Sequence, residues 1–437
     1  MLLTIHRKRY RRKSVNIEQN AIVHKLLFVF FAIIMSLLLV GCNLICNWFP
    51  ELCNPSTIGN KITVCDEYST ALPTQRKLAR TTDGNLHVVY HRRDENGILQ
   101  IFHAESSDNG ITWKEEQVTY APRDQCFPAL AIDSNDNLHL VWNDNWPTKP
   151  GIIPNVYYRK KTSGGWQPPE FIASYATYPS LAVDSRDNVH VVYGAYVYEP
   201  GYWGGGNGIR WRLRTAVGWQ AEESISAEKQ WARYPSIAID SNDNVHVVWN
   251  HAPRYRFYDV HYRKKTASGW EMEIEISRDS DSTPPYPVVA IDNYDCVHIV
   301  WHQQEGASYN TAQDGYWSIR HRVYIDSWQP IEILAGPTRF LQVCPTIAID
   351  DKNQIHVIWA GRTESSPSIY QLQYKHFEAT GWRPIRRLTS SINNQEWPNL
   401  MWAFYPVLHG DKINQPAEGF IVIWVDGMSL KCYSTAK

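Results

Sequence analysis

One phrase recurs along the chain and limits what it can fold into. Around His139 it reads Pro-Ala-Leu-Ala-Ile-Asp-Ser-Asn-Asp-Asn-Leu-His-Leu-Val-Trp, and similar phrases occupy 179–193, 235–249, 287–301 and 345–359. A degenerate first copy ends at Tyr90, and a degenerate last copy begins at Tyr405-Pro406 and ends at Trp424. The histidines at 87, 139, 190, 246, 298 and 356 are 52, 51, 56, 52 and 58 residues apart. Repeats of this length are typical of solenoids, propellers and related arrays.

Each copy of the phrase reads as a β-hairpin that two further strands follow. The two halves of the phrase are rich in β-branched residues, and the Asp-Ser-Asn-Asp-Asn cluster between them consists of turn formers. A third run, such as 156–160, ends at a tight turn that closes in Gly-Trp, and a fourth run leads to the next copy. Four strands in about 50 residues is the size of a propeller blade. We therefore predict an all-β fold, a seven-bladed β-propeller of four-stranded blades, over residues 60–437.

The last copy predicts how the ring closes. After Trp424 the chain has room for one more strand, near 430–434, so the last blade lacks its outer strand. The run Lys61-Ile62-Thr63-Val64-Cys65 precedes the first copy and has no blade of its own. Pairing the two chain ends removes an open sheet edge and closes the ring. Cys65 and Cys432 then lie on neighbouring strands and are one candidate disulfide, with Cys46 and Cys53 as another.

Residues 1–41 read as an export signal and not as part of the fold. Seven Lys/Arg residues precede or flank an apolar run of 15 residues, 26–40, which is short for a membrane span. The run ends in Leu39-Val40-Gly41-Cys42, which resembles a bacterial lipobox. The resemblance implies cleavage and lipidation at Cys42, with 42–59 as a tether; an uncleaved signal anchor is the alternative. We expect a protein of the bacterial cell envelope that touches the membrane only through its lipid.

The net charge and the cysteine pattern argue against nucleic-acid binding and against a zinc site. Loss of residues 1–41 removes seven Lys/Arg and one Asp/Glu and leaves 36 basic and 43 acidic residues. A mildly acidic chain is a poor nucleic-acid binder, because phosphate neutralisation needs a basic face. Export permits disulfides, and no cysteine or histidine spacing resembles a zinc site. We therefore predict no nucleic-acid partner and no metal or other cofactor, and we expect a monomer.

A turn in the first copy carries a family resemblance. It reads Ser106-Ser107-Asp108-Asn109-Gly110-Ile111-Thr112-Trp113, which resembles the Asp-box of the sialidase-like propellers with BNR repeats. The resemblance implies the fold, and in that family the Asp-box lies on the face away from the active site. Where sialidases carry Phe/Tyr-Arg-Ile-Pro, this chain reads Gln75-Arg76-Lys77-Leu78-Ala79. The seven copies look more like certain lectins and ulvan-lyase-type polysaccharide lyases, so activity does not follow from the fold.

The repeated residues themselves favour structural roles. The phrase histidines occupy the same strand position in successive copies, and packed sheets stand ~10 Å apart, so they cannot share a metal ion. We expect each to be hydrogen-bonded between blades. The Asp-rich turns lack the alternation of a calcium loop and read as Asx-type turns. The Gly-Trp tryptophans read as packing residues.

The variable loops carry the functional prediction. The loops after the second and fourth strands should share one face, which we call the loop face, and they are rich in Trp, Tyr, Arg and carboxylates. Aromatic rings stack on sugars, and Arg binds carboxylates through two parallel hydrogen bonds. The predicted ligand-binding residues are Arg93, Arg123, Trp146, Trp203, Trp231, Arg233, Arg254, Arg339, Arg362 and Trp397.

Three functions remain open. The first is glycan binding, of an anionic sugar, at one composite site, since the loops differ strongly between blades. The second is a sialidase-like glycoside hydrolase or a polysaccharide lyase, and the third is a protein-interaction scaffold. Catalysis would require an acid and a base, and no spacing selects a pair. The available carboxylates are Asp94, Asp124, Glu199, Glu305 and Glu396.

Overall fold

The computed structural model divides the chain into two units, Met1–Ile58 and Gly59–Lys437. It describes residues 60–65, 69–145, 153–196, 206–226, 231–254, 257–281, 285–306, 315–390, 395–402, 420–426 and 429–434. The predicted signal, Cys42, the tether, Cys46 and Cys53 lie outside the described residues. Across the described ranges no helix is long and apolar enough to cross a membrane.

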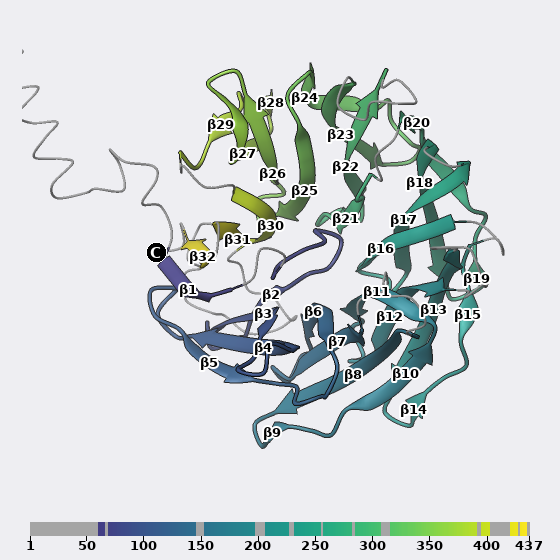
Figure 1. The fold of residues 1–437 in the computed structure, drawn as a ribbon. Helices are drawn as coiled ribbons and strands as arrows, with labels where there is room; N and C mark the ends of the chain where they lie inside the picture. The colour runs from purple at the N-terminus through teal and green to yellow at the C-terminus, as the bar shows by residue number, and fades with distance from the viewer. Residues whose placement is uncertain are drawn as a thin grey trace, which may run out of the picture. The chain divides into compact units, whose positions relative to one another are not determined.

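Seven antiparallel sheets form the blades of a β-propeller, with the first strand of each repeat nearest the centre of the ring (Figure 1). Blade one holds β2 (Leu78–Arg80), β3 (Leu86–Arg93), β4 (Leu99–Ser106) and β5 (Lys114–Gln117). Blade two holds β6 (Gln125–Ile132), β7 (Leu138–Asp144), β8 (Asn155–Thr162) and β10 (Glu170–Ser174). Blade three holds β11 (Ala176–Val183), β12 (Val189–Tyr196), β13 (Gly206–Thr215) and β15 (Glu223–Ser224). Blade four holds β16 (Trp231–Ile239), β17 (Val245–Arg254), β18 (Phe257–Thr266) and β20 (Ile274–Asp281).

The remaining blades follow the same order. Blade five holds β21 (Val288–Ile291), β22 (Val297–Glu305), β23 (Tyr316–Tyr324) and β24 (Glu332–Thr338). Blade six holds β25 (Gln342–Ile349), β26 (Ile355–Thr363), β27 (Ser366–Glu378) and β29 (Arg386–Arg387). Blade seven holds β30 (Gln395–Trp402), β31 (Phe420–Asp426), β32 (Ser429–Ser434) and β1 (Asn60–Val64). The Gly-Trp turns form two-residue strands, β9 (Gly165–Trp166), β14 (Gly218–Trp219), β19 (Gly269–Trp270) and β28 (Gly381–Trp382). The predicted seven-bladed propeller is confirmed.

The predicted ring closure is also confirmed. Strand β1 pairs antiparallel with β32, from Asn60 opposite Cys432 to Val64 opposite Ser429. The first and last strands of the propeller therefore lie side by side and complete blade seven (Figure 1). The pairing leaves β32 with a partner on each side, so its backbone donors and acceptors are not exposed at an edge.

The Cys65–Cys432 disulfide is not formed, and both residues are buried thiols. The register explains this outcome, because Cys432 lies opposite Asn60 and not opposite Cys65. Cys65 is five residues beyond Asn60 along β1 and the residue that follows it. At about 3.3 Å per residue, this distance far exceeds the roughly 4.4–6.8 Å Cα separation of a disulfide. Both cysteines pack instead in an apolar cluster with Leu86 and Ile423.

The predicted start of the last repeat, Tyr405-Pro406, is wrong. The inner strand of blade seven is β30, and its register shifts between Glu396 and Asn399, around Trp397-Pro398. In blade two the same shift lies around Phe127-Pro128. Trp397-Pro398 thus occupies the Xaa-Pro position of the phrase, while Tyr405-Pro406 lies outside the described residues, between β30 and β31.

The hydrophobic core lies between neighbouring blades. On β3, Val88 and Tyr90 pack in a cluster that includes blade seven, while Val89 packs toward blade two. Successive side chains of a strand point to opposite faces, and each blade has a neighbour on both faces, so both sets are apolar. The tryptophans that end the phrase, such as Trp249 and Trp301, are fully buried.

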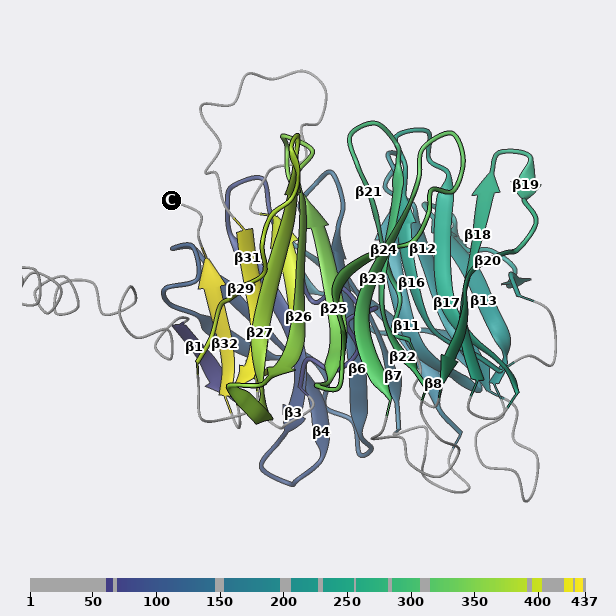
Figure 2. The same ribbon diagram turned by 90° about the horizontal axis from the view of Figure 1, so that it is seen from above.

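The strand pairing defines two faces. Asp144 pairs with Gln125 and with Asn155, so the start of the inner strand, the end of the second and the start of the third share one edge. Ile132, Leu138 and Lys161 share the opposite edge. In Figure 2 the strands run between these two faces and the connections gather at both ends. The loops after the second and fourth strands therefore share the loop face, as predicted, and we call the opposite face the turn face.

The hydrogen bonds described for the phrase histidines lie within their own blade, whereas the sequence predicted bonds between blades. The Nδ1 atom of His139 lies 2.8 Å from the hydroxyl of Tyr158 on the third strand. Its Nε2 atom lies 3.0 Å from Asp133 in the hairpin turn. Because the imidazole bridges the turn and the third strand of one sheet, it holds the blade together instead of joining it to its neighbour.

The contacts between blades on the turn face come from the Asx turns. Asp133 Oδ1 accepts hydrogen bonds from the backbone amides of Asn135 (3.0 Å) and Asn137 (2.9 Å), as an Asx-type turn requires. Ser134 of the same turn donates its amide (2.8 Å) and its hydroxyl (2.7 Å) to Asp187 in the turn of blade three. The same bonds join the later turns up to blade five, and Asn293 reaches Asn353 of blade six.

The Gly-Trp tryptophans also join blades. The indole nitrogen of Trp219 donates to Glu170 of the preceding blade at 2.7 Å, and Trp270 donates to Glu223 at 2.7 Å. Trp166 and Trp382 make the equivalent bonds. These side chains are therefore packing residues between outer strands, as the sequence indicated.

The 106–113 segment forms the turn between β4 and β5 on the turn face. Asp108 Oδ1 accepts hydrogen bonds from the hydroxyl of Ser106 and from the amide of Thr112, each at 2.8 Å. Gly110 has φ +86°, which a side chain would strain. Arg80 of β2 also donates to Asn109 Oδ1 at 2.8 Å, so the motif that resembles an Asp-box has a structural role in this chain.

Candidate functional site

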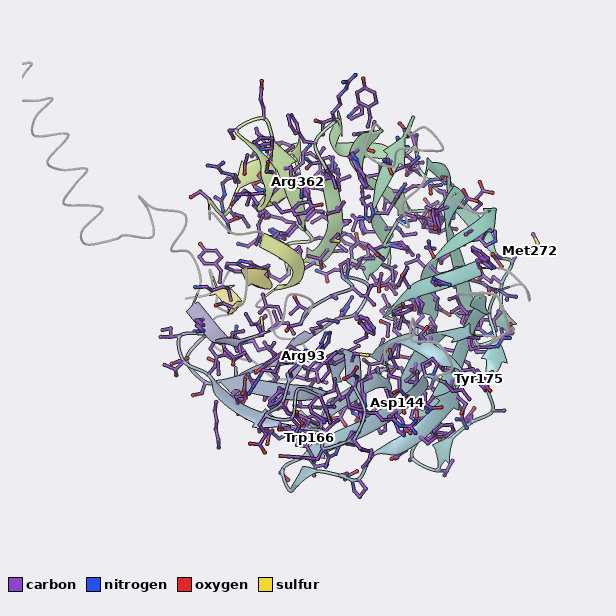
Figure 3. The ribbon with its side chains drawn as sticks, viewed as in Figure 1. Arg93, Asp144, Trp166, Tyr175, Met272 and Arg362 are labelled. Atoms are coloured by element: carbon purple, nitrogen blue, oxygen red, sulfur yellow. The ribbon has the colours of Figure 1, made fainter. Side chains whose placement is uncertain are left out.

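Five predicted arginines lie on the loop face with described side chains. Arg93 ends β3, Arg123 precedes β6, Arg233 lies early in β16, Arg339 precedes β25, and Arg362 lies near the end of β26. Arg93, Arg123 and Arg339 are exposed, and the other two are half-buried. Arg93 and Arg362 lie nearer the centre of the ring than Trp166 and Met272, which are at its periphery (Figure 3).

Three of these arginines contact a described neighbour. Arg93 Nη1 donates to the carbonyl of Gly97 at 2.6 Å. The guanidinium of Arg339 lies 5.7 Å from the ring centre of Tyr316, and that of Arg362 lies 4.3 Å from the ring centre of Tyr370. A guanidinium carries five N–H donors, and a contact with an aromatic ring leaves these donors available for an anion.

The other predicted ligand residues are less fully described. Trp146 and Trp203 lie outside the described residues. Trp231 begins β16 and is half-buried. Arg254 ends β17 and Trp397 lies in β30, so their backbones are on the loop face, but their side chains are outside the description.

A segment that sequence reasoning missed enters the central channel. Residues 69–77, between β1 and β2, run into the middle of the ring (Figure 1). The side-chain amide of Gln75 donates to the carbonyls of Phe127 (2.9 Å) and Pro179 (2.6 Å), on the inner strands of blades two and three. The amine of Lys77 donates to Gln75 Oε1 (3.0 Å) and to the carbonyl of Pro128 (2.9 Å). We call residues 69–77 the channel segment; its polar side chains take up carbonyls that the inner strands turn toward the axis.

An aromatic arc covers part of this segment. Phe127, Tyr178, Tyr234 and Tyr286 come from the Xaa-Pro positions of blades two to five, and their ring centres are 5.2, 4.6 and 4.7 Å apart in turn. Leu72 of the channel segment packs in the same cluster. Phe127, Tyr178 and Tyr234 have φ near +55°, so each bulge turns an aromatic side chain inward. The repeated Xaa-Pro dipeptide was the available sequence signal for this arc.

The imidazole of His91 lies beside the channel segment, where blades one and two meet. His91 is buried, and its Nδ1 atom accepts a hydrogen bond from the amide of Phe127 at 3.4 Å. Burial, together with the charge of Lys77, lowers the pKa of His91 to about 3. Burial also lowers the pKa of Lys77 well below its usual range. The imidazole is therefore neutral at physiological pH and serves as a backbone acceptor.

The carboxylates proposed as catalytic candidates have structural partners where they are described. Asp94 accepts hydrogen bonds from the amides of Asn96 and Ile98, at 2.9 and 3.0 Å. Asp124 accepts one from the amide of Leu99, at 3.1 Å, and Glu305 pairs with Arg320. Glu199 and the side chain of Glu396 lie outside the described residues. The described members of this set therefore hold loops in place.

One cluster among the described residues has donor atoms that suit a metal ion. It consists of His251, Asp259 and His261 on blade four, each offering one ligand atom within 4.8 Å of the others. Sequence reasoning predicted no metal site, because these residues do not form a linear spacing motif.

No family model matches the chain, and no curated protein matches its sequence. Solved structures do resemble it. A polysaccharide lyase of family PL25, an ulvan lyase bound to -[GlcA(1-4)Rha3S]-, aligns over 87% of this chain and 96% of its own, with 11% identity and a TM-score of 0.58. An α-L-arabinanase from Penicillium chrysogenum complexed with arabinobiose aligns over 87% and 98%, with 12% identity and a TM-score of 0.51. The polysaccharide lyase Uly1 aligns over 88% and 94%, with 8% identity and a TM-score of 0.51.

At these identities the alignments establish a shared fold and not a shared activity. The β-propeller of this chain is thus the fold of several carbohydrate-active proteins, which include two polysaccharide lyases and an arabinanase.

Proposed function

We propose that the protein binds an anionic polysaccharide on its loop face. The observation that carries the proposal is the gathering of arginines from blades one, two, four and six on this face, around a channel that the chain's own residues 69–77 enter. The turn face is instead occupied by the hydrogen bonds that join the blades. The loop face therefore presents exposed arginine side chains, at Arg93, Arg123 and Arg339, to a ligand.

The chemistry of arginine indicates the kind of sugar. A guanidinium binds a carboxylate or sulfate through two parallel hydrogen bonds, which a neutral sugar cannot accept equally well. The exposed ring of Tyr316 lies beside Arg339 and adds a surface on which a pyranose can stack. Support also comes from the similar ulvan lyase, whose bound unit contains glucuronic acid and a sulfated rhamnose.

The export signal fits this function. A lipid on Cys42, followed by the tether 42–59, would hold the propeller at the bacterial cell envelope, where extracellular polysaccharides are met. The lipobox Leu39-Val40-Gly41-Cys42 supports this localisation. Loss of membrane association in a Cys42→Ala variant tests it; unchanged association and mass would favour a signal anchor.

Binding is tested with an array of uronic and sulfated glycans and calorimetry on the best ligand. Arg123→Ala and Arg339→Ala should each weaken binding by about 1–3 kcal/mol, the scale of a hydrogen bond to a charged group. Arg186→Ala is the matched control, because its side chain is 71% exposed on the turn face. Equal affinity in all three variants, or no binding of any anionic glycan, would leave a protein-interaction role as the better explanation.

A second candidate is cleavage of the bound chain, and one group on the loop face favours it. Burial and the charge of Asp144 raise the pKa of Tyr157, whereas Arg123 lowers it. The raised pKa keeps the Tyr157 phenol protonated, so it is a candidate proton donor to the leaving oxygen of a glycosidic bond. Release of unsaturated uronate, followed by its ultraviolet absorbance, would reveal lyase activity, and Tyr157→Phe should abolish turnover while binding persists. Unchanged turnover in that variant would exclude Tyr157.

A further inference from the structure

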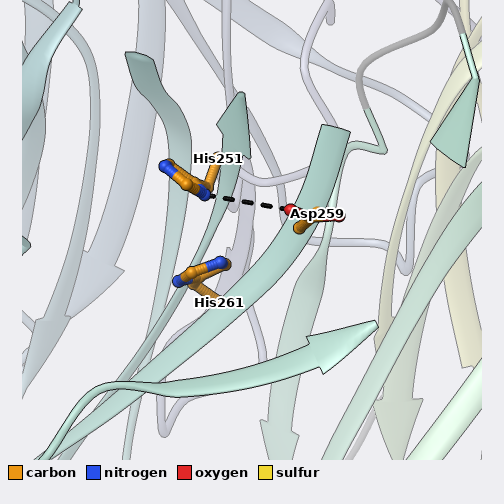
Figure 4. A group of neighbouring side chains, drawn as sticks. All are labelled: His251, Asp259 and His261. Atoms are coloured by element: carbon orange, nitrogen blue, oxygen red, sulfur yellow. Dashed lines mark ion pairs between the residues drawn. The ribbon is translucent and has the colours of Figure 1, made fainter. Parts of the chain in front are cut away.

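The His251, Asp259 and His261 side chains face one another on blade four (Figure 4). Strands β17 and β18 pair with His251 directly opposite Asp259, and His261 lies two residues beyond Asp259, on the same face of the sheet. The His251 Nδ1 atom is 4.0 Å from the Asp259 carboxylate, and the two imidazole centres are 4.4 Å apart. The arrangement therefore converges two ring nitrogens and a carboxylate on one small space.

The cluster is enclosed, and three of its four ring nitrogens have no hydrogen-bond partner among the described residues. The side chains of His251 and Asp259 are 8% and 13% exposed, and that of His261 is 12% exposed. Within the described part of the chain, neither ring nitrogen of His251 has a hydrogen-bond partner, nor does Nε2 of His261. Buried polar atoms are almost always satisfied, so unpartnered nitrogens in one place indicate a missing ligand.

A further carboxylate orients one of these rings. The Nδ1 atom of His261 lies 2.5 Å from Glu273 Oε1. This hydrogen bond places the proton on Nδ1 and leaves the lone pair of Nε2 directed away from Glu273. A histidine held in this way by a carboxylate is the usual second layer of a protein metal site.

The propeller repeat does not account for the cluster. His251 has Asp144 at its position in blade two, where Trp142 pairs with Tyr157 as Trp249 pairs with His261. The corresponding residues of the other blades are Arg92, Ala195, Gln303, Gly361 and Asp426, so the fold itself does not require histidine there. The cluster is therefore specific to blade four.

We propose that His251, Asp259 and His261 bind one divalent transition-metal ion of the zinc class. Two imidazoles and one carboxylate suit zinc, whereas calcium and magnesium prefer oxygen ligands alone. Three protein ligands leave one coordination position for water or another oxygen donor. The site lies near the loop-face end of β17 and β18, and it does not depend on the proposed glycan binding.

The test uses the full propeller stripped with a chelator and titrated with Zn²⁺ alone by calorimetry, with metal content measured by mass spectrometry. One equivalent should bind and raise the melting temperature. Asp259→Asn keeps the side-chain shape and should abolish tight binding, as should His251→Ala. Glu273→Gln should weaken affinity about 10–100-fold, as expected for the second layer.

The control is His376→Ala, a histidine of blade six that contacts Glu378. It should bind zinc like the parent chain. Cobalt substitution adds a readout that does not depend on stability, because the visible spectrum of Co²⁺ reports low-coordinate geometry in the folded parent and in the control. No bound zinc in the parent, or equal binding in Asp259→Asn and the control, would overturn the proposal.

Discussion

Replacing His91 with asparagine should remove a defined part of the protein's sensitivity to acid. His91 is 1% exposed, and burial above all lowers its pKa to about 3. In the unfolded chain the histidine pKa is about 6.5. Between that pH and about 3, His91 is therefore protonated in the unfolded chain but stays neutral in the folded protein. The contribution to stability is complete above pH 6.5 and is lost as the pH falls toward 3.

The size of the stability loss follows from the pH range between the two pKa values of His91. Each pH unit below 6.5 lowers the free energy of unfolding by about 1.36 kcal/mol, so about 2 kcal/mol is lost at pH 5 through this one side chain. Asparagine is the matched replacement, because Asn143 holds the same position in blade two. Its Oδ1 atom accepts a hydrogen bond from the amide of Tyr178 at 3.2 Å, as His91 does from Phe127. The variant therefore keeps the acceptor and loses the titration.

The assay is urea unfolding, followed by tryptophan fluorescence, of both proteins at pH 7.5 and pH 5. Any packing loss in His91→Asn is the same at both values and cancels in the difference. The parent should lose about 2 kcal/mol more than the variant between the two pH values. Equal losses would show that the imidazole is not held neutral in the folded protein, and the assignment of His91 as a buried backbone acceptor would be wrong.

Three further changes test the architecture. Deletion of 60–65 should lower the melting temperature, because β32 would lose its outer partner; an unaltered melting temperature would contradict the closure. Trp219→Phe keeps the ring but removes the donor to Glu170, and it should cost about 1 kcal/mol in chemical unfolding, since the carboxylate is partly exposed. Asp187→Ala removes both bonds from Ser134 at a residue with φ +62°, so it should cost about 1–3 kcal/mol, with Asp187→Asn much milder.

The architecture could be predicted from the sequence alone. The spacing of the phrase histidines set the blade size, and seven copies set the number of blades, because strands and tight turns are encoded by neighbouring residues. The unpaired run at Lys61–Cys65 and the short last repeat were enough to predict the closing strand. Antiparallel strands place successive connections on opposite faces, so the two faces could also be predicted. Arg93 and Arg339 lie on the loop face, as the sequence predicted.

Features that depend on strand register, or on contacts between residues distant in sequence, could not be predicted in this way. Gln75 donates a hydrogen bond to the carbonyl of Pro179, 104 residues away. No local sequence pattern predicts that the channel segment enters the ring. The register of β1 separated Cys65 from Cys432, and the register of β30 moved the last Xaa-Pro bulge to Trp397-Pro398. The three proposed metal ligands lie close together because β17 pairs with β18, so their spacing in the sequence does not predict a metal site. Local order is encoded along the chain, whereas the site chemistry arises only when its strands lie side by side.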